Sequence, residues 1–113
     1  MSSARLEQLL AFYEEDPDDA FTRFAIAQEY RKAGAQQQAI SFYEQLIEDQ
    51  PSYTGTYYHL GKIYEEEGRI EDAIAIYHRG IQAAREQRNL KDLSELQGAL
   101  LQAQGVGFDD EDE

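Results

Sequence analysis

The amino-acid sequence predicts an all-α fold of antiparallel helix pairs, with about six helices in 113 residues. The chain repeats itself with a period of 34 residues, because residues 20–53 and 54–87 align without a gap and share seven identical positions. Within each repeat, apolar residues recur at helical spacing in two stretches that a glycine separates, Gly34 or Gly68. Because such a unit buries its apolar faces only against its neighbours, the pattern indicates a stacked array.

Each repeat is predicted to form a helical hairpin. Gly34 and Gly68 follow the first helix of each pair, where a left-handed residue commonly ends a helix. The identical positions include Tyr30/Tyr64, Ala39/Ala73, Ile40/Ile74, Tyr43/Tyr77 and Ile47/Ile81. Small residues are expected to let the two helices approach closely, Ala27 or Gly61 on one helix facing Ala39 or Ala73 on the other.

The flanking segments extend the repeat on both sides. Residues 5–17 align with 39–51, so a leading helix over 3–16 corresponds to the second half of a repeat, with Phe12 at the position of Leu46. A capping helix is predicted over 90–104, with Asn89 as the break before it and Gly105 as its end. Its apolar face is expected to hold Leu93, Leu96, Leu100 and Leu101. Residues 1–104 would then form a single domain, and 105–113 a disordered acidic tail.

These motifs resemble the tetratricopeptide repeat. The second unit reads Tyr57-x-x-Leu60-Gly61-x-x-Tyr64 with Ala73-x-x-x-Tyr77, and the first reads Ile26-Ala27-x-x-Tyr30 with Ala39-x-x-x-Tyr43 and Pro51. Two positions depart from the pattern: Arg23 replaces the large aromatic, and Arg85 replaces the second proline. The loss of that proline suggests that the second helix of this unit continues to Gln87 or Arg88. The resemblance implies a right-handed α-solenoid that binds other proteins on its concave face.

The same resemblance identifies the residues that line this groove, on the first helix of each pair. They are Phe21, Phe24, Gln28 and Arg31 in the first unit, and Tyr58, Lys62 and Glu65 in the second. Aromatic residues and arginine are the types that most often dominate binding energy at interfaces. As an alternative, Phe24 or Tyr58 simply packs between helices. The lysine and asparagine clamp with which some members of the family hold chaperone C-termini is not present at these positions.

Composition narrows the classes of partner. The formal net charge of −13 disfavours nucleic acids and anionic membranes, while 42% hydrophobic residues favour a folded chain. The chain has no cysteine and no apolar run that could cross a bilayer, so a cytoplasmic protein is expected. Three lysines against 23 acidic residues fit either a protein from a salt-rich cytoplasm or an ordinary acidic protein.

The sequence offers no arrangement typical of catalysis, of a metal site or of a cofactor site. His59 and His78 lack a nucleophile at a suitable spacing, and the acidic residues 14–19 lack the glycine and glutamate of a calcium loop. Capping aspartates at a turn explain this run better. We therefore expect a scaffold or adaptor for an unidentified protein or peptide, as a monomer. The alternatives are a self-associating structural protein, which would form a dimer, and, last, an enzyme.

Overall fold

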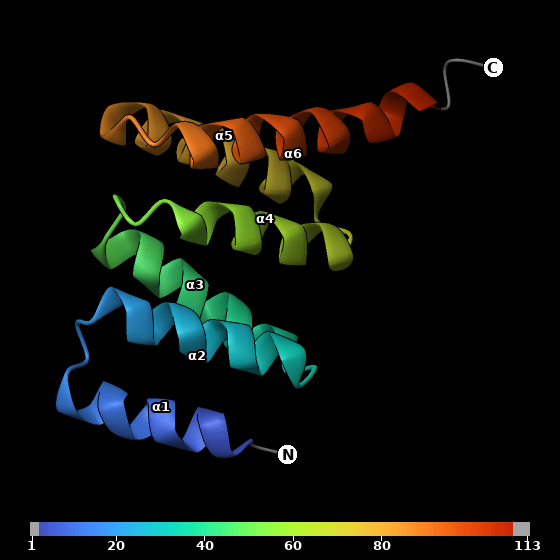
Figure 1. The fold of residues 1–113 in the computed structure, drawn as a ribbon. Helices are drawn as coiled ribbons and strands as arrows, with labels where there is room; N and C mark the ends of the chain where they lie inside the picture. Colours follow the sequence, from blue (N-terminus) through green and yellow to red (C-terminus); the bar gives the residue numbers. More distant parts are fainter. Residues whose placement is uncertain (1–2, 110–113) are drawn as a thin grey trace. The chain divides into compact units, whose positions relative to one another are not determined.

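The computed structural model describes the backbone of residues 3–109 and the side chains of residues 3–105, and within this part of the chain it contains six helices and no strand (Figure 1). The helices are α1 (Ala4–Glu15), α2 (Ala20–Lys32), α3 (Gln36–Asp49), α4 (Gly55–Glu66), α5 (Ile70–Gln87) and α6 (Leu90–Asp109). The predicted all-α class is confirmed. The helices fall into two compact units that divide between Tyr53 and Thr54, where one sequence repeat ends and the next begins.

In the first unit, α2 and α3 form the predicted hairpin. Gly34 ends α2 with a φ of +82°, and the N–H of Ala35 donates a hydrogen bond to the carbonyl of Tyr30 at 2.9 Å. The glycine satisfies the last carbonyls of the helix in a conformation that residues with a Cβ rarely adopt. The apolar side of α3 is fully buried, as the spacing predicted; its innermost residues are Ala39, Tyr43 and Leu46.

Helix α1 packs against α2 through Leu6 and Leu9, which form a buried cluster with Ala25 and Ile26. Its start is capped by Ser3, whose hydroxyl accepts a hydrogen bond from the N–H of Leu6. One position on α1 differs in burial from its counterpart on α3. Phe12 stands at the position of the fully buried Leu46, yet 57% of its surface is exposed, since no described helix covers that side of α1 as α2 covers α3.

The acidic turn between α1 and α2 contains a helix cap, as predicted. The carboxylate of Asp19 accepts hydrogen bonds from the N–H of Thr22 at 2.9 Å and from its hydroxyl at 2.6 Å. These two bonds hold the pKa of the Asp19 carboxyl below its usual value. Asp19 therefore begins α2, and its role in the turn is structural.

In the second unit, α4 and α5 form the matching hairpin, with Gly68 at a φ of +78°. The predicted close approach involves Gly61, but its nearest side chain is Tyr77, whose ring leaves no room for a Cβ there. Helix α5 ends at Gln87, so its predicted extension is confirmed. Asn89 then starts α6, as expected, by accepting a hydrogen bond from the N–H of Asp92 at 3.0 Å.

Two predictions for the last helix are wrong. Helix α6 continues through Gly105 to Asp109, because a helix-interior glycine costs only about 1 kcal/mol and does not by itself end a helix. The expected disordered tail therefore begins with helical backbone, and its residues 110–113 lie outside the described part. Leu101 is 70% exposed, whereas Ala99 and Ala103 are buried beside Leu96. The side of α6 that packs closely is the one with small residues.

Candidate functional site

The candidate face of the first unit lies on α2. Phe21 is the most exposed of its residues, with 62% of its surface accessible, whereas Phe24, Gln28 and Arg31 are half-buried. The ring of Phe24 lies 5.8 Å from that of Tyr43 and 5.7 Å from that of Tyr53, centroid to centroid. Phe24 thus packs against two tyrosines of the first unit, as one of the two interpretations of the sequence expected, and part of its side chain stays accessible.

Arg31 places a positive charge beside the most buried tyrosine of this unit. Burial raises the pKa of the Tyr43 hydroxyl to about 12, and the nearby Arg31 guanidinium opposes that rise. The α2 face therefore presents an exposed aromatic ring at its start and a cationic group near its end.

The candidate face of the second unit lies on α4, where three of the predicted residues form one row. The ammonium group of Lys62 lies 5.5 Å from the ring centroid of Tyr58 and 3.9 Å from a carboxylate oxygen of Glu65. The same carboxylate accepts a hydrogen bond of 2.5 Å from the hydroxyl of the buried Tyr77. Lys62 is therefore held between an aromatic face and a carboxylate, and Glu65 is anchored from the interior of the unit.

The two faces differ in one chemically important way. Arg31 and Glu65 are 34 residues apart and so occupy equivalent positions, each beside a buried tyrosine of the following helix, Tyr43 or Tyr77. The first face offers a cation there and the second an anion. Each face therefore has its own charge preference, and neither repeats the chemistry of the other.

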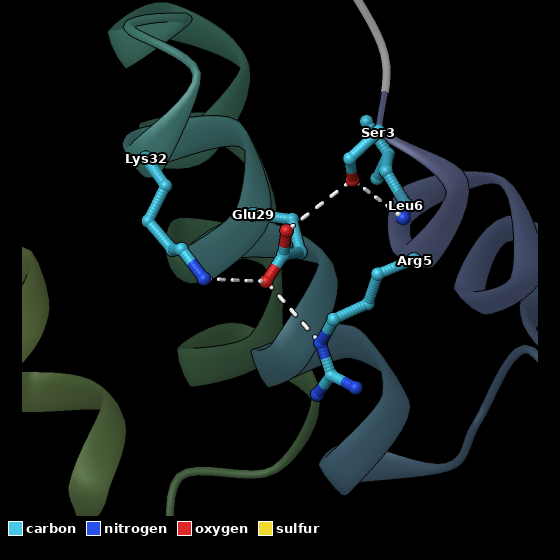
Figure 2. A network of polar contacts seen from close by, with 5 residues as sticks. All are labelled: Ser3, Arg5, Leu6, Glu29 and Lys32. Carbon is cyan, nitrogen blue, oxygen red and sulfur yellow. Dashed lines mark hydrogen bonds and ion pairs between the residues drawn. The ribbon is translucent and has the colours of Figure 1, made fainter.

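Sequence reasoning missed one polar cluster around a buried carboxylate, which Figure 2 shows in the first unit. Glu29 of α2 is only 9% exposed, and its carboxylate oxygens accept hydrogen bonds from Arg5 at 3.2 Å, Lys32 at 3.3 Å and Ser3 at 3.4 Å. A signal was present in the alignment, since the second unit has the fully buried Ile63 at the matching position.

The Glu29 cluster joins the start of α1 to α2. Desolvation works against the charged form, but the hydrogen bond from Lys32, the charges of Lys32 and Arg5, and the hydrogen bond from Ser3 outweigh it and keep the pKa of the Glu29 carboxyl below its usual value. The carboxylate is therefore a docking point between two helices, and we assign it a structural role.

The described residues hold no group of three or more histidine and acidic side chains that could bind a metal ion. His59 lies against the ring of Tyr58, at 5.5 Å between centroids, and His78 is exposed. Over the same part of the chain, none of the helices has the length and apolar character needed to span a bilayer.

Comparison with known proteins agrees with this architecture. A family model described as tetratricopeptide repeat matches residues 11–100. The crystal structure of a tetratricopeptide repeat domain protein from Salinibacter ruber is 52% identical, covers 78% of this chain and 99% of its own, and superposes with a TM-score of 0.75. A solution structure of a tetratricopeptide repeat domain protein from the same organism, also 52% identical, covers 82% and 94% with a TM-score of 0.78.

A more distant structure shares the fold alone. The protein BPP2914 from Bordetella parapertussis is 22% identical, covers 91% of this chain and 89% of its own, and gives a TM-score of 0.76. No protein of curated function matches the sequence. The family model and the two 52% identical structures agree with the all-α helical repeat fold described above. The chain belongs to the tetratricopeptide repeat family.

Proposed function

We propose that this chain is a scaffold or adaptor that binds a protein or peptide through the faces of α2 and α4. The tetratricopeptide repeat is in general a protein–protein interaction module. The observation that carries the proposal is the exposure of Phe21, a large aromatic at the start of α2 whose helix also bears the cationic Arg31. Exposed aromatic side chains with arginine nearby are characteristic of binding hot spots.

The chemistry of the two faces indicates the kind of peptide. The α2 face would take an apolar side chain on Phe21 and a carboxylate on Arg31. The α4 face would take an apolar or aromatic side chain on Tyr58 and a polar group on Lys62 and Glu65. The net charge of −13 disfavours nucleic acids and anionic membranes as partners, and the lack of cysteine fits work in the reducing cytoplasm.

The experiment is affinity capture from the native cytosol, followed by identification of the partner and measurement of its affinity for the purified chain. The double variant Phe21→Ala/Tyr58→Ala should lose the partner, whereas Leu90→Ala/Leu101→Ala, which truncates two exposed side chains on α6, should retain it. Phe21 is a better target than Phe24, because truncating Phe24 would also remove its contacts with Tyr43 and Tyr53. Equal affinity of the Phe21→Ala/Tyr58→Ala variant and the parent would reject these faces.

Self-association is the second candidate function, and it is favoured by four large hydrophobic residues that are exposed among the described side chains. They are Phe12, Phe21, Leu90 and Leu101. The net charge of −13 opposes close pairing of two copies at low salt. Sedimentation equilibrium in low and high salt distinguishes the two functions, because a dimer that forms only when charges are screened would support self-association.

A further inference from the structure

Helix α1 and helix α3 end in the same way, which allows the C-terminal half of α3 to be used as a template for that of α1. Residues 16 and 50 end the two helices with nearly the same backbone angles, φ −144° and ψ 79° against φ −140° and ψ 70°. The N–H of Asp16 donates to the carbonyl of Phe12 at 2.9 Å, and the N–H of Gln50 donates to that of Leu46 at 2.8 Å. A proline follows in both cases. Phe12 therefore has the same place on α1 as Leu46 has on α3.

The two positions differ in what covers them. Leu46 is fully buried in the α2–α3 hairpin, while Phe12 is 57% exposed. In the second unit the matching pair is in direct contact, since a Cβ on Gly80 would lie 2.6 Å from Cβ of Tyr57. Tyr57 corresponds to Arg23 of the first unit. By the 34-residue repeat, Arg23 of α2 occupies the position that faces Leu46 on α3. No helix in the described part of the chain occupies the equivalent position beside Phe12.

The ion pair of Arg23 indicates the chemistry that would suit α1. Arg23 is only 4% exposed, and its guanidinium lies 2.8 Å from the carboxylate of Asp49 in the last turn of α3. Residue 15, at the position of Asp49, is also an acid, Glu15, and it is exposed and makes no ion pair with any described residue. An arginine reaching α1 in the same way could lay its aliphatic stem on Phe12 and its guanidinium on Glu15.

We propose that the C-terminal half of α1, around Phe12 and Glu15, is a docking surface for an arginine-bearing amphipathic helix of another polypeptide. The docked helix covers Phe12 as α2 covers Leu46. The docked helix is short, because the N-terminal half of α1 cannot be approached as closely as that of α3. Arg5 of α1 stands at the position of the small Ala39 of α3, and its guanidinium already pairs with Glu29 at 3.2 Å. A second copy of α1 is disfavoured as the occupant, since Glu14, Glu15 and Asp16 would meet the same acids.

The test uses the full-length chain and a synthetic peptide of residues 19–34, with blocked ends, which contains the sequence of the helix that covers α3. Amide chemical shifts should change around Phe12 and Glu15 on addition of the peptide. Phe12→Ala should weaken binding by about tenfold or more, whereas Leu101→Ala should leave the affinity unchanged. Because Phe12 is exposed, its truncation should not change the melting temperature.

A charge exchange makes the test specific to the proposed contact. A peptide with Arg23→Glu should bind the parent chain several-fold more weakly, and Glu15→Arg in the chain should restore its binding. Fusing the peptide ahead of residue 1 through a Gly/Ser linker raises its effective concentration and should protect the amides of α1 from exchange.

Four results would overturn the proposal. The first is that the α1 amides of the fusion exchange as fast as those of the parent chain, and the second is that the peptide binds Phe12→Ala and the parent with equal affinity. The third is that the peptide shifts only amide signals of α3 or of the α4 face. The fourth is that the parent chain forms a dimer that Phe12→Ala dissociates. Any of the first three would show that α1 has no such docking surface, and the fourth would show that a second copy of this chain occupies it.

Discussion

Two glycines of the second unit, Gly61 and Gly80, lie directly against tyrosine side chains of the opposite helix. The Tyr77 ring occupies the space where a Cβ of Gly61 would be, and the Cβ of Tyr57 lies against Gly80. Glycine at these positions allows an aromatic side chain to lie directly on the backbone of the opposite helix. In the first unit Ala27 corresponds to Gly61, and Tyr43 corresponds to Tyr77. The first unit therefore has one methyl group more at this position than the second.

We expect Gly61→Ala to destabilise the protein by about 1–3 kcal/mol, because the Tyr77 ring must move to admit the methyl group. Gly98→Ala is the matched control. Gly98 is also helical but has no other atoms within 4 Å of an added Cβ, so this change should stabilise by roughly 0.5–1 kcal/mol. Urea denaturation of both variants checks the pair, and equal shifts of the two midpoints in the same direction would contradict the packing described for Gly61.

Tyr43 should make the protein sensitive to alkali. Burial raises the pKa of its hydroxyl in the folded chain to about 12, while in the unfolded chain it titrates near 10. The unfolded state therefore loses its proton first, and the stability that Tyr43 contributes is complete below pH 10 and is lost as the pH rises towards 12. Burial also raises the pKa of Tyr57 and, together with the charge of Asp19, that of Tyr53, so all three contribute in the same direction.

The measurement is the free energy of unfolding as a function of pH, for the parent chain and for Tyr43→Phe. The parent should lose stability steadily above pH 10, and the variant should show a smaller slope over the same range, since phenylalanine has no proton to lose. Identical slopes for the two proteins would show that Tyr43 ionises with an ordinary pKa.

At the scale of elements, the connection between α5 and α6 depends on a single residue in an unfavourable conformation. Arg88 has a φ of +56°, and it is the one non-glycine residue with a positive φ in the described chain. Its conformation lets the N–H of Asn89 reach the carbonyl of Ala84 at 2.9 Å while the Asn89 side chain begins α6. The Asn89 amide also reaches Thr54, at the start of α4, at 3.3 Å, which fixes the direction of the last helix within this unit.

We expect Arg88→Gly to stabilise the protein by about 0.5–1 kcal/mol, because glycine avoids the left-handed penalty at the cost of some unfolded-state entropy. Arg85→Gly, three residues earlier in the last turn of α5, should destabilise by about 1 kcal/mol. Thermal unfolding with circular dichroism distinguishes the two. A loss of stability in Arg88→Gly would mean that its side chain has contacts that outweigh the backbone strain.

At the scale of the whole molecule, charge is the dominant feature. The net charge of −13 on 113 residues favours solubility and disfavours compaction, because like charges repel over distances comparable to the size of the protein. At an ionic strength of 0.01 M the screening length is about 30 Å, and at 1 M it is about 3 Å. The balance of acidic residues over lysine and arginine therefore makes stability dependent on salt.

We expect the melting temperature to rise from low to molar potassium chloride, as the interpretation of a salt-rich cytoplasm requires. Sucrose at the same osmotic strength is the control, because it strengthens burial without screening charge. A melting temperature that does not rise with salt, or that rises equally with sucrose, would identify an ordinary acidic protein.

The sequence by itself determined the features that depend on neighbours along the chain. The period of 34 residues, the left-handed glycines at 34 and 68, and the continuation of α5 to Gln87 were all predictable, because helix periodicity and helix ends are local. The apolar side of α3 followed from the same spacing. The seven candidate partner-binding residues came from the family resemblance, and their role remains a prediction.

Only the tertiary structure decided which of these side chains are covered. The exposure of Phe12 and Leu101, the burial of Glu29 between two helices and the seat of Tyr77 on Gly61 each depend on a helix distant in the sequence. A helical pattern states that one side of a helix is apolar, but not whether a neighbour is present to bury each residue on that side. Burial depends on three-dimensional contacts, and for this protein those contacts separate the residues that hold a unit together from those that can meet a partner.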